Sequence, residues 1–210
     1  MTRFRTTGSL LGMAAVLLLA GSCVESKHPL SDEKTSKIDE RLIGRWKIES
    51  DQGEWAVQKS TKVPNAIEID VPGPDAGRVL GFVTTVKDKG YISTRDADIK
   101  KRDEKTPQPD KTDSTGYEIY QYVFLTADRV QCRGMVPEVI VKAIENKTLT
   151  GEARIKKTTT RTLFGKETVK EEKVPVITAT PAELKKYLEA HADECFPVKQ
   201  EDPQIWVRQK

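Results

Sequence analysis

The chain has 210 residues, of which 37% are hydrophobic and 32% are charged, and its formal net charge is +3 at pH 7. This is the length of one ordinary domain, and a second domain is not required. Acidic and basic residues are interleaved along the chain, so the composition gives no electrostatic reason to expect a nucleic-acid partner.

The start of the chain, residues 1–22, resembles the signal peptide of a bacterial lipoprotein. Two arginines precede the apolar run Leu10–Ala20, which is shorter than the about 20 apolar residues of a membrane-spanning helix. Leu19–Cys23 (LAGSC) resembles a lipobox, although Ala20 stands where leucine is commonest. The resemblance implies an exported, membrane-tethered protein with lipid on Cys23. The alternative is an ordinary secretory signal that leaves Cys23 as a thiol or a disulfide partner.

The residue after the cysteine is Val24 and not aspartate, which by the same resemblance favours the outer membrane over the inner membrane. The protein is thus expected to be exported and tethered to a membrane, either at the outer membrane or facing the periplasm. Residues 23–39 are charged and nearly devoid of apolar side chains, so we predict a flexible tether, because little burial offsets the entropy of ordering them. Residues 40–210 then predict a single β-rich domain. Within it, the charged and turn-forming segment near 96–116 predicts a disordered loop.

Alternation of apolar and polar residues predicts half-buried strands in several runs separated by Gly and Pro turns. Short strands with this spacing favour an antiparallel meander that closes into a barrel or a sandwich. Tyr117–Leu125 differs because both of its faces are apolar, so this strand is expected to be covered on both sides. Tyr120, Tyr122 and Phe124 share one face, where they either line or fill a cavity, and Ile119, Val123 and Leu125 share the other. Lys156–Val174 predicts a polar, solvent-facing hairpin. The other alternating runs are Leu42–Glu49, Ala66–Val71, Arg78–Val86 and Gly151–Lys156.

Two short helices are predicted among the strands. The stronger pattern covers 181–191, where Thr180 and Glu183 form a capping box and Pro181 takes the first helical position. The other helix is expected at Pro137–Asn146, although its Val and Ile content leaves a strand as an alternative.

No catalytic or metal-binding pattern is found in the sequence. The chain has only two histidines, His28 and His191, far apart, and it lacks the spacings typical of zinc sites, nucleophile elbows and phosphate-binding loops. We therefore predict no cofactor and no metal, and an enzyme is the least favoured class of function.

Cys132 and Cys195 remain once Cys23 carries lipid, and they form an even pair in an oxidising compartment. Alternation places Cys132 and Val130 on the same inward face of a strand. A helix that ends near Cys195 would be linked to that strand by a Cys132–Cys195 disulfide, and Phe196 is expected to be buried beside it. The alternative is two buried thiols that behave as small apolar residues.

Gly44-Arg45-Trp46, on the expected first strand, resembles the Gly-x-Trp motif of lipocalins and their calycin relatives. The resemblance implies that Trp46 closes one end of a barrel and that a late arginine, here Arg208, packs across its ring. Three features depart from the family pattern. A mid-chain Thr-Asp-Tyr motif has no counterpart, Arg208 follows the late helix, and a helix near Pro137 interrupts the strands.

These features favour a non-enzymatic, membrane-anchored lipoprotein with a lipocalin-like barrel that carries a small apolar ligand. The alternative is a structural or protein-interaction lipoprotein of the cell envelope, in which the barrel is only a scaffold. The partners expected are therefore the membrane, through the lipid, and either a small hydrophobic ligand or an envelope protein.

Overall fold

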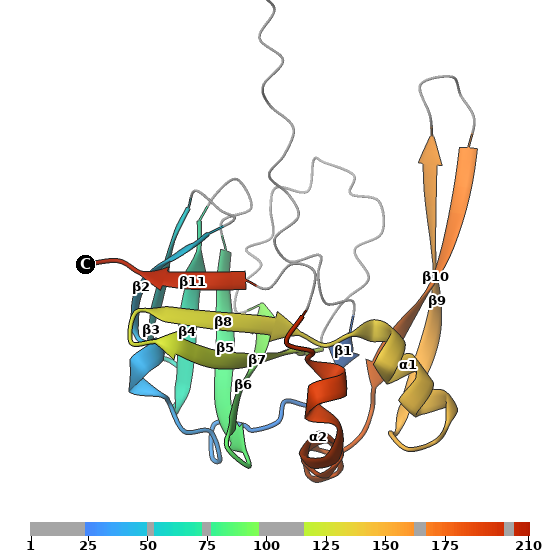
Figure 1. The fold of residues 1–210 in the computed structure, drawn as a ribbon, viewed down its shortest axis with the longest axis horizontal. Helices are drawn as coiled ribbons and strands as arrows, with labels where there is room; N and C mark the ends of the chain where they lie inside the picture. The colour runs from blue at the N-terminus through green and yellow to red at the C-terminus, as the bar shows by residue number, and fades with distance from the viewer. Residues whose placement is uncertain (1–23, 50–52, 73–76, 97–115, 162–166, 200–203) are drawn as a thin grey trace, which may run out of the picture.

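The computed structural model describes residues 24–49, 53–72, 77–96, 116–161, 167–199 and 204–210, in which eight antiparallel strands close into a barrel (Figure 1). Neighbouring strands pair in chain order from the first to the seventh, and the last strand, β11, pairs with both β8 and β2 to close the ring. The predicted β class and meander are confirmed, in the barrel form. The strands are β2 (Gly44–Ile48), β3 (Glu54–Lys59), β4 (Ala66–Val71), β5 (Gly77–Val86), β6 (Lys89–Asp96), β7 (Glu118–Thr126), β8 (Arg129–Gly134) and β11 (Gln204–Arg208).

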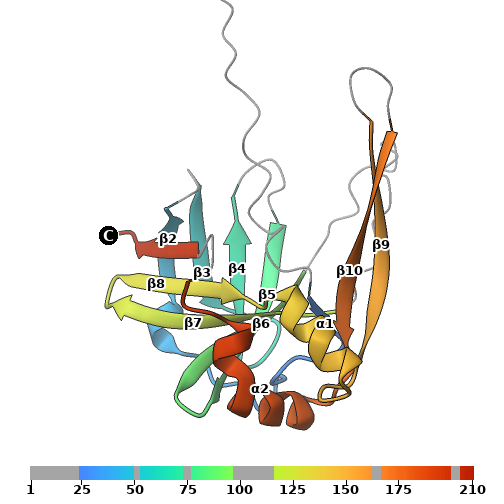
Figure 2. The same ribbon diagram turned by 45° about the vertical axis from the view of Figure 1, so that its right-hand side comes forward.

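A second structure is inserted between the last two barrel strands in the chain. It consists of helix α1 (Pro137–Glu145), strands β9 (Gly151–Arg161) and β10 (Glu167–Ile177), and helix α2 (Pro181–Cys195). The β9–β10 hairpin projects beside the barrel, as Figures 1 and 2 show, and the predicted hairpin is thereby confirmed.

Both predicted helices are present. The segment for which a strand was the alternative forms helix α1. α2 begins at Pro181 with the expected capping box, in which Thr180 Oγ1 accepts a hydrogen bond from the Glu183 backbone, and it extends past residue 191 to Cys195.

The barrel wall separates two apolar clusters. Because side chains alternate between the two faces of each strand, one set points into the barrel. This interior cluster includes Trp46, Trp55, Trp206, Ile48, Val57, Ile92 and Cys132. The outer surface of β6 and β7 contributes Tyr91 and Ile119 to an outer cluster that α2 covers with Leu184, Leu188, Cys195 and Phe196. Burial of Phe196 is therefore confirmed, with 0% of it exposed.

The N-terminal segment 24–39 is not the flexible tether that its composition predicted. Val24 and Leu30 are buried, and the segment lies along the outside of the barrel. The Ser36 hydroxyl donates to the Val83 carbonyl and accepts from the Val83 amide, both at 2.9 Å, and Leu30 N donates to Ser93 Oγ at 3.0 Å. The segment is therefore held in place by hydrogen bonds between serine hydroxyls and backbone groups and by the burial of Val24 and Leu30, although its composition is hydrophilic.

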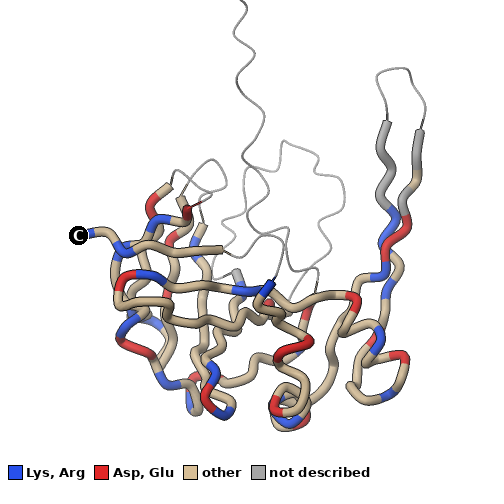
Figure 3. The backbone as a smooth tube through the Cα atoms, in the orientation of Figure 1, with Lys and Arg blue, Asp and Glu red and all other residues tan. Residues whose placement is uncertain are grey.

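The 3-10 helix η1 (Glu40–Leu42) joins this segment to β2. Acidic and basic residues are mixed over the barrel and along the part of the hairpin nearer the barrel (Figure 3). Within the described ranges, no helix combines the length and the apolar character needed to cross a membrane. The predicted signal peptide and Cys23 lie outside the described residues. The predicted loop near 96–116 also lies outside them, except for its two ends. Asp96 is the last residue of β6, and Gly116 comes shortly before β7.

Candidate functional site

One end of the barrel is closed by the three residues that the sequence singled out. Trp46 is fully buried, and its indole Nε1 donates to the Leu42 carbonyl at 2.8 Å. The guanidinium carbon of Arg208 lies 4.2 Å from the centroid of the Trp46 ring, and Nη1 donates to the Ile43 carbonyl at 2.9 Å. Gly44 has φ of +142°, and a Cβ there would lie 2.5 Å from Arg208 Nη1. The structure therefore brings Gly44, Trp46 and Arg208 together as expected.

A polar cluster reinforces the same closed end. Asp39 accepts hydrogen bonds from Arg41 Nη2 at 2.7 Å and from the Tyr122 hydroxyl at 3.1 Å. The hydrogen bond from Arg41 is the main cause that lowers the pKa of Asp39, so the carboxylate stays charged. Arg41 also lies over Phe124, 4.3 Å from the ring centroid. Tyr122 and Phe124 thus pack at this closed end of the barrel.

A cavity of about 40 Å³ lies at the opposite end of the barrel. Its walls come from the last residues of β4 and β6 and the first residues of β5, β7 and β11, whereas Gly44 begins β2 at the closed end. Tyr120 is the only residue of the predicted aromatic face that lines it. The lining residues are Trp55, Ile69, Val79, Ile92, Thr94, Tyr120, Cys132, Gln204 and Trp206.

The cavity wall is apolar with few polar groups. The Tyr120 hydroxyl donates to Glu118 Oε2 at 2.5 Å. Burial, followed by the nearby Glu118 charge, raises the pKa of Tyr120 well above its usual value, so the phenol stays neutral. The indole Nε1 of Trp206 is buried and has no hydrogen-bond acceptor among the described residues.

The volume limits what the cavity can hold. A water molecule needs about 10–15 Å³ by the same measure, so the space accommodates roughly three water-sized groups. This is room for the end of an apolar chain and not for a large ring system. The three tryptophan rings fill much of the remaining interior, with Trp206 5.8 Å from Trp55 and 6.3 Å from Trp46 between centroids.

The predicted disulfide between Cys132 and Cys195 is wrong, since both thiols are free and buried. Cys132 lines the interior cavity, whereas Cys195 belongs to the cluster outside the barrel wall. α2 does end near the β8 strand, because the Val136 amide donates to the Cys195 carbonyl at 2.9 Å. The two sulfurs nevertheless face opposite sides of the wall. Burial raises the pKa of both thiols to about 12, so neither is a nucleophile at neutral pH.

One buried polar group was missed by the sequence reasoning. Arg133 is only 7% exposed and lies on the outer face of β8. Its Nε donates to Gln131 Oε1 at 3.1 Å and its Nη1 to Gln121 Oε1 at 3.5 Å, while Gln121 donates to the Tyr91 hydroxyl at 3.3 Å. Strand register aligns these side chains across β6, β7 and β8. Alternation alone would have placed Arg133 in solvent.

The described residues contain no group of three or more metal-ligating side chains. His191 stacks on Tyr187, 4.6 Å between ring centroids, which is a packing role on α2.

The site that remains is thus a small apolar cavity at one end of a barrel whose other end is closed by Trp46 and Arg208. Comparison of the chain with protein-family models, with curated proteins and with solved structures gave no match.

Proposed function

We propose that the protein is a lipocalin-like lipoprotein of the cell envelope, anchored through lipid on Cys23, whose barrel binds the apolar end of a small ligand. The lipobox-like segment that ends at Cys23 supports the anchor. The observation that carries the binding role is the apolar cavity at one end of the barrel, framed by Trp55, Ile69 and Trp206.

The small volume defines the kind of ligand. A chain end of a few carbons fits the space, and each buried methylene contributes about 0.8 kcal/mol. The rest of an amphiphile would lie outside the cavity, near Thr94, Gln204 and the Tyr120–Glu118 pair. A fatty acid or the acyl chain of a lipid has this shape.

Native mass spectrometry of the protein from its own host would detect a bound lipid directly. A second measurement uses fatty acids that carry bromine at the terminal carbon, because bromine quenches the fluorescence of nearby tryptophans. Trp55 and Trp206 line the cavity, so we expect saturable quenching.

The matched variants for this titration are Val79→Phe and Val123→Phe. Val79 lines the cavity, so a larger side chain there fills it, whereas Val123 is 36% exposed on the barrel surface. We expect Val79→Phe to abolish the quenching and Val123→Phe to leave it unchanged. Equal quenching of both folded variants, or none in the unchanged protein, would contradict ligand binding in the barrel.

The projecting β9–β10 hairpin favours a second candidate function, a protein-interaction lipoprotein. Ile155 is 61% exposed and Val169 is 55% exposed on this hairpin, and an isolated two-stranded ribbon gains little stability by itself. A photo-crosslinking residue at Val169 would then capture one envelope protein reproducibly in cells, and the same residue at Lys186 on α2 would not. Absence of a reproducible product at Val169 argues against this function.

A further inference from the structure

The anchored cysteine is joined directly to the folded domain. Consecutive Cα atoms are about 3.8 Å apart across a trans peptide bond, and Val24, the residue after Cys23, is only 3% exposed. Val24 belongs to the same outer cluster as Leu30 and Ile119. No length of free chain therefore separates the site of lipid attachment from the domain.

Strand β1 (Glu25–Ser26) is held on both sides. On the barrel side, Ser26 N donates to the Tyr117 carbonyl at 2.8 Å and Tyr117 N donates to the Ser26 carbonyl at 2.7 Å. On the hairpin side, β1 pairs in parallel with Val176 and Ile177 of β10. The Glu25 side chain covers Gly116 so closely that a Cβ there would lie 2.2 Å from Glu25 Cγ. β1 thus links the barrel to the base of the hairpin.

We infer that the domain rests directly on the lipid bilayer in a fixed orientation, with the surface around β1, between Tyr117 and the base of the β9–β10 hairpin, toward the membrane. This inference rests on the proposed lipid anchor. Arg95 adds an exposed positive charge to this surface, where it lies over the Tyr117 ring at 5.6 Å, and such charges favour anionic headgroups.

The same placement brings the cavity close to the membrane. Tyr117 directly precedes β7, and Tyr120, three residues further, lines the cavity. At about 3.3 Å per residue, these two positions are roughly 10 Å apart along the strand. A lipid chain end could therefore pass between the bilayer and the cavity without crossing the periplasm.

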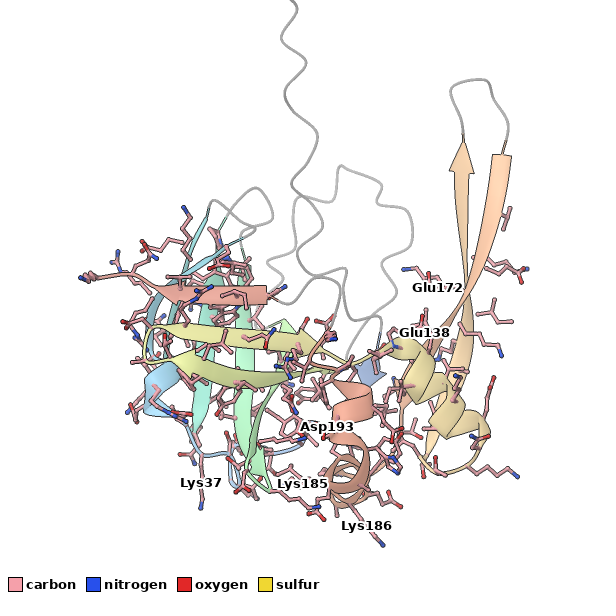
Figure 4. All side chains as sticks on the ribbon, viewed as in Figure 1. Lys37, Glu138, Glu172, Lys185, Lys186 and Asp193 are labelled. Atoms are coloured by element: carbon pink, nitrogen blue, oxygen red, sulfur yellow. The ribbon has the colours of Figure 1, made fainter. Side chains whose placement is uncertain are left out.

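The test uses the full-length lipoprotein in vesicles whose headgroups carry a nitroxide quencher. Fluorophores are attached at single introduced cysteines, Glu172→Cys on the hairpin and Lys37→Cys and Lys186→Cys on the far side, all exposed in the structure (Figure 4). Cys132 and Cys195 are buried, so the protein without an added cysteine serves as the labelling control. Quenching by a soluble ion corrects for differences in exposure of the three labels.

The matched control inserts about 20 Gly and Ser residues between Cys23 and Val24, a spacer with an average span of about 25 Å. We expect several-fold stronger headgroup quenching at residue 172 than at residues 37 and 186, and loss of this difference with the spacer. Equal quenching at the three positions in the lipidated protein would overturn the fixed orientation alone. An N-terminal peptide without lipid, identified by mass spectrometry, would overturn the anchor and the orientation together.

Discussion

The guanidinium of Arg208 occupies the space that any side chain at residue 44 would need, since a Cβ on Gly44 would lie 2.5 Å from Nη1. The same guanidinium covers Trp46 at 4.2 Å. Gly44, Trp46 and Arg208 therefore act as one unit, in which the glycine permits the arginine to close the barrel end over the tryptophan.

Gly44→Ala should lower the free energy of unfolding by roughly 2–4 kcal/mol, because the φ of +142° strains alanine and the methyl group displaces Arg208. Urea unfolding of this variant, of Arg208→Ala and of the double variant gives the coupling between the two positions. Gly77→Ala, at the exposed start of β5, is the control and should have little effect. Fully additive costs at positions 44 and 208 would refute the steric link.

The N-terminal segment offers a second prediction. Ser36→Ala removes the hydroxyl that accepts the hydrogen bond of the Val83 amide, and a buried donor without a partner costs about 1–3 kcal/mol. We expect that loss of stability, together with faster hydrogen exchange at Val83. Lys37→Ala, next to it and exposed, should change neither quantity. Unchanged exchange at Val83 in Ser36→Ala would show that the segment does not pack there in solution.

The closed end of the barrel was predictable because its parts have recognisable sequence signals. Gly44 and Trp46 stand together at the start of an alternating run, and Arg208 lies in the last one. Antiparallel pairing of neighbouring strands followed from the turn-separated alternation, but β3 and β6 were not among the predicted runs, and Gly151–Lys156 belongs to the hairpin and not to the barrel. These patterns are local, and they predict the orientation of side chains in the folded strand because burial of one face fixes the strand register.

The N-terminal segment and the thiols were not predictable from such patterns. Composition counts apolar residues, and it missed that Ser36 and its neighbours replace apolar burial with hydrogen bonds to backbone groups. Alternation correctly placed Cys132 inward. That placement prevents the disulfide, because α2 packs on the outside of the wall, and only the tertiary arrangement decides the side on which a helix docks.

The free thiols predict a chemical behaviour in the folded protein. With a pKa of about 12, Cys132 and Cys195 carry about 1 thiolate in 10,000 molecules at pH 8. We expect no alkylation of either thiol in the native state and complete alkylation of both in urea, as measured by intact mass. A peptide that links the two cysteines, recovered without reduction, would contradict the separation by the barrel wall.

The raised thiol pKa also predicts instability at alkaline pH. Burial raises the pKa of Cys132 from 9.0 to about 12 in the folded state, so folding favours the protonated thiol. This contribution to stability is complete below pH 9 and is lost as the pH rises from about 9 to about 12. The loss is at most about 1.4 kcal/mol per pH unit for each thiol.

Urea unfolding under reducing conditions between pH 8 and pH 11 would measure this slope, and Cys132→Ala removes the contribution of that thiol. The variant should be less stable at pH 8, because it enlarges the cavity, but its stability should fall less steeply above pH 9. Ionisation of buried tyrosines, Tyr120 among them, adds to the slope only at higher pH, because their ordinary pKa is 10.0. Identical slopes between pH 9 and pH 10 in the variant and the unchanged protein would mean that folding does not raise the pKa of Cys132.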